Sequence, residues 1–154
     1  MWRLVWTNDA PNPNHFALLQ KGADVWNCWR QDNLAIILSL HSAELEGVDL
    51  KGFHLNRVEF IGANLEEANL KNANLNKAHL RQANLKGAKF QGASLSEADL
   101  SEADLSGADL SFAHLQEAKL TGAKLIGIEP RYVQKFIISA EKHYWLWLSA
   151  FCSR

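Results

Sequence analysis

The sequence predicts an all-β solenoid, and a strict five-residue repeat is the main observation behind this prediction. In a chain of 154 residues, seventeen consecutive units run without an insertion from Ala43 to Gly127. The first position is Ala in fourteen units, and the third is Leu except for Phe60 and Phe90. Self-similarity at a fixed short period is typical of a solenoid, in which each repeat packs only against its neighbours.

The period of five is the second observation, because neither regular element can bury such a pattern. Five residues of an α-helix advance by about 500°, so the Leu positions would be spread around the helix without forming an apolar stripe. In a straight strand side chains alternate, so a five-residue step sends successive Leu side chains to opposite faces. A chain that turns a corner in every unit can instead direct Ala and Leu inward and the other three positions outward.

Stacked coils would then pair their backbones with the coils above and below, at a spacing of about 4.8 Å. The residues themselves leave the number of sides per coil open. Glycines at the fifth position, such as Gly47, Gly87, Gly107 and Gly127, fit a coil of fifteen residues about as well as one of twenty.

The repeat divides the chain into four segments. Pro130 ends the periodic pattern, and a helical pattern of apolar residues lies on either side of the repeats. The predicted segments are an N-terminal extension (1–13), an N-terminal capping helix with the strand that enters the first coil (14–42), the repeat β-helix (43–129) and a C-terminal helix (130–154).

The N-terminal helix is predicted over residues 14–32, with Asn14 as its N-cap. Its apolar residues fall near one face, and Cys28 is expected to pack there as a small apolar side chain. Because an open solenoid end exposes core and strand edges, we expect this face to plug the first coil. A partner-binding patch formed by the two tryptophans is the alternative. The expected capping residues are Phe16, Leu19, Trp26 and Trp29.

Residues 34–40, LAIILSL, read as a buried strand, in which Leu38 and Leu40 fit a further, degenerate unit. At the other end, residues 131–151 carry more aromatic side chains than capping a slim rod requires, including Trp145 and Trp147. A surplus aromatic surface often indicates association. We therefore hypothesise a homodimer contact through the C-terminal helix.

The units follow the pattern A(D/N)LXX and so resemble the pentapeptide-repeat family. The piece ADVWNCWR also resembles the segment that precedes the repeats in many cyanobacterial members. The resemblance implies a right-handed quadrilateral parallel β-helix with four units per coil, which gives about four coils here. Residues twenty apart are then stacked neighbours, and the expected core ladder includes Leu65, Leu85, Leu105 and Leu125.

Charge and composition exclude several functions. Sixteen basic residues nearly balance seventeen acidic ones, so the cationic field that supports direct nucleic-acid binding is absent. The start, MWRLVWTNDAPNPNH, lacks the basic n-region followed by an apolar h-region that a secretory signal has. The longest apolar run, YWLWLSAFC, is too short to span a bilayer. We therefore expect a cytoplasmic protein without a membrane partner.

No catalytic constellation is apparent. The chain contains no GxSxG, P-loop, HExxH or CxxC motif. The histidines in and beside the repeats are expected to be solvated side chains, and we predict no metal, no cofactor and no catalytic residue. An enzyme is therefore not expected.

The stretch SEADLSEADLSGADL, residues 96–110, is the most acidic part of the repeats. Some members of the family resemble B-DNA in shape and charge and bind DNA gyrase. The acidic stretch therefore makes DNA mimicry the alternative function for this chain. The repeats as a whole carry twelve acidic and nine basic residues, and in a four-sided coil Lys or His would lie one coil away from each Asp. The candidate interaction surface comprises Asp99, Glu102, Asp104, Asp109, Trp145 and Trp147.

We therefore expect a non-enzymatic scaffold that mediates interaction with an unidentified protein partner. The alternative is a DNA-mimicking regulator of DNA gyrase or another topoisomerase.

Overall fold

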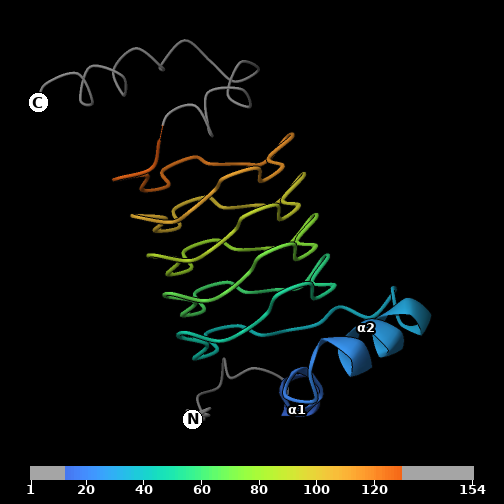
Figure 1. Cartoon of the computed structure of the whole chain (residues 1–154). Coiled ribbons are helices and arrows are strands. Elements are labelled where there is room, and N and C mark those ends of the chain that lie inside the picture. The colour runs from blue at the N-terminus through green and yellow to red at the C-terminus, as the bar shows by residue number, and fades with distance from the viewer. Residues whose placement is uncertain (1–12, 130–154) are drawn as a thin grey trace, which may run out of the picture.

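The computed structural model describes residues 13–129, in which two helices precede a stack of coils (Figure 1). The helices are α1 (Pro13–Leu19) and α2 (Ala23–Asp32), and they lie at the end of the stack where the repeats begin. Within the coils the backbone pairs through isolated parallel bridges. The repeats therefore build the body of the described chain, and the helices lie at one end of it.

The bridges define the size of a coil. They recur every five residues from Ser39 to Lys124, and each joins a residue to the one twenty positions further on, as in Glu44↔Asn64. An interval of twenty residues contains four units. The choice that the glycines left open is thus decided in favour of four units per coil.

Units with a coil on either side use their backbone groups in the same way. The second and third positions pair with the coils on either side, the fifth position donates to the next coil, and a turn bond closes the corner. The unit that begins at Ala63 illustrates this with Asn64 N→Ala43 O (2.9 Å), Leu65 N→Asn84 O (2.8 Å), Glu67 N→Lys86 O (2.8 Å) and Ala68 N→Leu65 O (3.1 Å).

The corner requires a left-handed backbone at the fifth position. Every unit from Ala43 to Gly127 has a positive φ there, including non-glycine residues such as Glu67 (55°) and Phe112 (59°). A positive φ at the third residue of a four-residue turn is the mark of a type II turn, which favours glycine. The glycines therefore reflect a turn in each unit, and for this reason their spacing did not reveal the number of sides.

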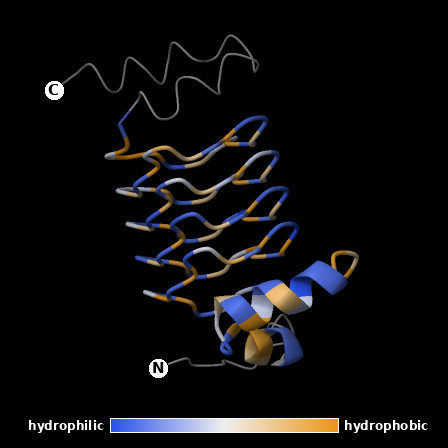
Figure 2. Cartoon of the chain, turned by 45° about the vertical axis from the view of Figure 1, so that its right-hand side comes forward, coloured by the Kyte–Doolittle hydropathy of each residue, from blue (hydrophilic) through white to orange (hydrophobic). Residues whose placement is uncertain are grey.

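The core is a ladder of inward side chains along the axis of the stack. Leu65, Leu85 and Leu105 are completely buried, and Leu125 is 6% exposed. Figure 2 shows hydrophobic and hydrophilic residues alternating along the coils, as the inward and outward positions require. Burial of each Leu side chain contributes about 1.5–3 kcal/mol before entropy is counted.

The prediction of one helix over residues 14–32 is wrong. Gly22, with a φ of 92°, separates α1 from α2, and α1 begins at Pro13 rather than after an Asn14 cap. A residue with this backbone conformation cannot continue a right-handed helix. The prediction for Cys28 is also wrong, because its side chain is exposed. On a helix it lies about 200° around from Trp26, which is buried.

The buried strand predicted over residues 34–40 is only partly present. Leu38 and Leu40 are completely buried, and Ser39 pairs with Glu59. The residues before them form a loop instead, because backbone bonds and a side chain of α2 hold that segment away from the stack. Its exposed side chains are Leu34 (53%), Ile36 (40%) and Ile37 (67%).

Candidate interaction surfaces

The first coil has no preceding coil with which to pair, and side chains of α2 bond its open edge. In later coils the N–H and C=O of the second position bond to neighbouring coils. At His54 these two groups meet side chains instead: Asn27 Oδ1 accepts from His54 N at 2.7 Å, and Trp26 Nε1 donates to His54 O at 2.7 Å. The Trp26 ring also packs on Phe53, with centroids 6.1 Å apart.

Arg30 bonds a third group on this edge. It donates to the carbonyl of Asn56 at 2.8 Å, and also to the carbonyls of Asn33 at 2.7 Å and Ile36 at 3.0 Å. The side chain is completely buried, and no carboxylate pairs with it in the described part of the chain. Burial lowers the pKa of the Arg30 guanidinium, and the nearby charge of Arg57 lowers it further.

The sequence pattern did not reveal Asn27 or Arg30. Hydrophobic periodicity identifies apolar residues on a helix face, whereas these two polar side chains are placed by the unpaired groups of the coil. The signal that could have found Arg30 is its four-residue spacing from Trp26, which puts these two side chains on one face of the helix.

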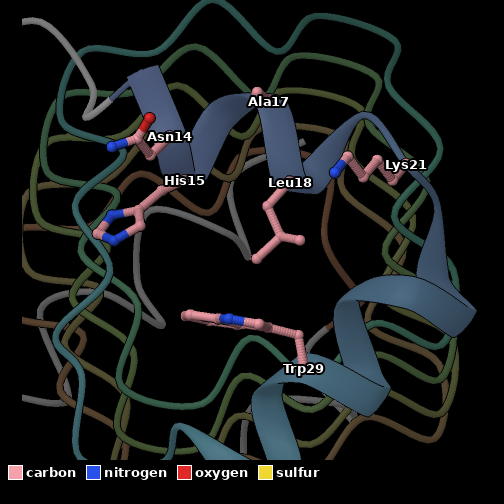
Figure 3. Close-up of a pocket in the computed structure, with 6 residues that line it drawn as sticks. All are labelled: Asn14, His15, Ala17, Leu18, Lys21 and Trp29. Atoms are coloured by element: carbon pink, nitrogen blue, oxygen red, sulfur yellow. The ribbon is translucent and has the colours of Figure 1, made fainter.

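A shallow pocket opens between α1 and α2, and Figure 3 shows Leu18 and Trp29 reaching into it from the two helices. Trp29 is half-buried there, whereas Trp26 is buried against the first coil. The two tryptophans therefore do not form a common surface patch. His15 also lines the pocket; burial and the charge of Arg30 lower its pKa.

The aspartates of residues 96–110 accept hydrogen bonds within their own turns. Oδ1 of Asp104 accepts from the backbone N–H of Ser106 at 3.1 Å and from its hydroxyl at 2.6 Å. Asp109 makes the same pair of bonds to Ser111, at 2.9 and 2.5 Å. Hydrogen bonds from these serines, the hydroxyl foremost, hold the pKa of Asp104 and of Asp109 below its usual value.

Asp99 behaves similarly, although burial alone would raise its pKa. Bonds from Ser101 and the charges of Lys119 and Arg81 outweigh that effect and lower the pKa. The three aspartates follow each other at five-residue intervals in a twenty-residue coil, and therefore lie on three different sides. The structure does not gather them into one acidic surface.

Basic side chains lie one coil away from most of these acids. Lys124 approaches Asp104 at 3.4 Å, and Arg81 approaches Glu102 at 3.5 Å. Such exposed pairs contribute at most about 1 kcal/mol to stability, but they interrupt the negative charge. A denser acidic group, which the one-dimensional pattern concealed, lies on one side of the first two coils and comprises Glu44, Glu46, Glu66 and Glu67.

Residues 13–129 contain no cluster for a metal ion and no helix that could span a membrane, and one predicted element lies outside this range. No group of three or more His, Cys, Asp or Glu in this range could hold a metal ion. Neither described helix is long and apolar enough to cross a membrane. Trp145 and Trp147, and the C-terminal helix that carries them, lie outside the described residues.

Comparison with known proteins shows which family and which solved structures this chain resembles. A family model that describes eight copies of the pentapeptide repeat matches residues 39–76, 63–101 and 93–128. The solved pentapeptide repeat protein Rfr23 from the cyanobacterium Cyanothece 51142 is similar, with 33% identity and a TM-score of 0.51. The match covers 57% of this chain and 64% of Rfr23. This chain therefore spans less than two thirds of that relative.

Two further structures are similar over part of the chain. HetL, described as involved in heterocyst differentiation regulation in Nostoc sp. strain PCC 7120, shares 36% identity over 58% of this chain and 45% of its own, with a TM-score of 0.34. QnrB1, a plasmid-mediated fluoroquinolone resistance protein, shares 20% identity over 75% of this chain and 66% of its own, with a TM-score of 0.42. No curated protein sequence matches the chain.

Proposed function

We infer the function from one premise: this chain belongs to the pentapeptide-repeat family. Proteins of this family fold into right-handed quadrilateral β-helices and are generally non-enzymatic proteins that mediate protein–protein interactions. We propose that this protein is such a scaffold and that its outward side chains bind a protein partner in the cytoplasm.

The observation that supports this proposal is the division of positions within each unit. The first and third positions are buried in every unit from Ala43 to Leu115, and backbone N–H and C=O groups are used between coils. Only the second, fourth and fifth positions remain to contact another molecule. These positions change in charge and size along every side, so a regular backbone displays a varied surface, which suits recognition better than catalysis.

Affinity capture after chemical cross-linking in the native host tests the proposal, with an unrelated tagged protein of similar size as the control. We expect the same polypeptide to be retained in repeated captures with the full chain and not with the control. If nothing is enriched over the control, the scaffold function is contradicted.

We also propose the architecture that carries this surface. It is a right-handed helix of about four coils, with α1 and α2 as an N-terminal cap and residues 130–154 as a C-terminal helix. The bonds from Trp26, Asn27 and Arg30 to the edge of the first coil support the cap. The homodimer contact through the C-terminal helix stays a prediction. Light scattering tests it, because a monomer at high protein concentration would exclude it.

Mimicry of DNA directed at gyrase is the competing function, and the charge distribution counts against it. A DNA mimic needs a continuous negative stripe along the rod, whereas lysines and arginines pair with several of the acids here. We expect no change in gyrase supercoiling at micromolar protein. Inhibition or protection of gyrase at that concentration would instead support the mimic.

A further inference from the structure

Three aliphatic side chains project into solvent from the loop between α2 and the first coil. We call Leu34, Ile36 and Ile37 the aliphatic loop; their exposed fractions are 53%, 40% and 67%. Figure 2 shows the loop as a hydrophobic stretch at the end of α2. Single exposed apolar residues are ordinary, but three large ones on one short loop indicate an interaction site.

The exposure of the aliphatic loop is fixed by the fold. Arg30, completely buried, holds the carbonyls of Asn33 and Ile36, at the two ends of the turn, and also the carbonyl of Asn56 in the first coil. The backbone N–H of Ile36 donates to the carbonyl of Asn33 at 3.1 Å. Burying an unpaired guanidinium is costly, so the loop would have to break several charge-assisted bonds to turn its side chains inward.

A cleft runs beside the aliphatic loop, and charged side chains of the first two coils complete it. These are Arg57, Glu59, Lys77 and His79. Glu59 lies 3.4 Å from His41, and Lys77 lies 3.2 Å from Glu97, so each already faces a side chain of the same molecule. Arg57 makes no ion pair with any described residue. The surface is therefore aliphatic on one side, and on the other side Arg57 is a cation without an ion-pair partner among the described residues.

We propose that the aliphatic loop and Arg57 form a docking site for a segment of another protein that combines aliphatic side chains with at least one carboxylate. The aliphatic groups of the segment cover the loop, and its carboxylate pairs with the guanidinium of Arg57, for which a bidentate geometry is available. This proposal rests on the scaffold function, because it names the chemistry of the partner that such a scaffold would bind.

The charges of the N- and C-terminal segments of this chain argue against either segment as the occupant of the docking site. Residues 130–154 contain four basic residues and one acidic residue, and residues 1–12 contain one of each. Residues 130–154 therefore have a net positive charge, which Arg57 repels, and residues 1–12 have no net charge that would attract them to Arg57. A partner of opposite charge would also associate faster at low salt.

Peptide display provides the direct test. Random peptides are selected on the full chain and then measured by fluorescence anisotropy against four variants. Ile37→Ser and Arg57→Glu alter the docking site, and Glu occurs naturally at the same turn position in other units. Ile126→Ser and Lys51→Glu are the matched controls, because Ile126 is 69% exposed in the last described unit and Lys51 is an exposed cation that forms no ion pair with the described residues.

We expect the selected peptides to combine Leu, Ile or Val with Asp or Glu. We expect Ile37→Ser and Arg57→Glu each to raise the Kd by about tenfold or more, as for central contact residues, and the controls to change it less than about twofold. Raising the salt concentration should also weaken binding, because the ion pair lies at the surface. Basic peptides, peptides indifferent to both site variants, or no selected peptides would overturn the proposal.

Repeating the cross-linking capture with the same four variants separates this proposal from the scaffold function. Loss of the partner from Ile37→Ser and Arg57→Glu alone supports the docking site. A partner retained by all four variants contradicts the docking site and leaves the scaffold function standing. Because all four side chains are exposed, circular dichroism should show a native fold in each variant.

Discussion

Truncating Leu85 to Ala tests the core ladder. Leu85 is completely buried between Leu65 and Leu105, which lie one coil away on either side and are also completely buried. The change removes three carbons, or about 2.4 kcal/mol at about 0.8 kcal/mol per methylene. Backbone bonds fix the spacing of the coils, so the cavity cannot close fully and adds a further term. We expect the free energy of unfolding to fall by about 3–4 kcal/mol.

The same substitution at Leu125 is the matched control. Leu125 is 6% exposed. It belongs to the last described unit, which pairs only with the coil before it in the described chain. In a solenoid each repeat is stabilised chiefly by its neighbours, so the end position should lose only about 1–2 kcal/mol. Urea unfolding followed by circular dichroism measures both values, and unchanged slopes show that the comparison is valid. Equal losses at the two positions, or a loss below about 1 kcal/mol for Leu85→Ala, would refute this reasoning.

Three further substitutions test the turns, the aspartates and the buried arginine. Phe112→Gly should stabilise the protein by about 0.5–1 kcal/mol, because Phe112 is 83% exposed at a φ of 59°, where glycine is favoured; a lower melting temperature would reveal a contact of Phe112 that outweighs the backbone strain. Ser106→Ala should raise the pKa of Asp104, measured by carboxyl NMR titration, since the lost hydroxyl bond helps to lower it. The lowered pKa stabilises the fold above the unfolded value of about 3.9, and this contribution is lost as the pH falls through the folded pKa; an unchanged titration would show that the hydroxyl has no effect. Arg30→Met should leave the carbonyls of Ile36 and Asn56 without the donor that they now bond and lower stability by about 2–4 kcal/mol, and urea unfolding that shows no loss would mean that removing the buried charge compensates fully.

The positions that face the interior of the repeat could be predicted from the sequence, because every unit is subject to the same geometric constraint. Ala and Leu recur two residues apart, and a period of five allows them one common face only if the chain turns in each unit. The burial of Leu65, Leu85 and Leu105 follows from that step, whatever the number of sides. The family resemblance supplied the four-sided coil, and the pairing of residues twenty apart agrees with it.

The ends and the outer surface could not be read in this way. Gly22 divides the N-terminal helical pattern, and the aliphatic segment at 34–37 lies in solvent although its composition predicts burial. Apolar periodicity does not show that Arg30 would be placed by the carbonyls of an unpaired coil edge. The separation of Asp99, Asp104 and Asp109 onto three different sides is the exception, because it follows from the four-sided coil that the family resemblance implied, and the pairing of residues twenty apart agrees with it.

The sequence by itself therefore determined which positions face inward, because that choice depends on steps of two and five residues along one chain. Tertiary structure alone decided which outward side chains meet. Those contacts join residues about twenty positions apart, such as Arg81 with Glu102, and the packing of the buried Trp26 on Phe53 is likewise a long-range contact. They depend on the stacking of coils and on the docking of α2 against an open edge, where unpaired backbone groups select polar partners that no local pattern marks.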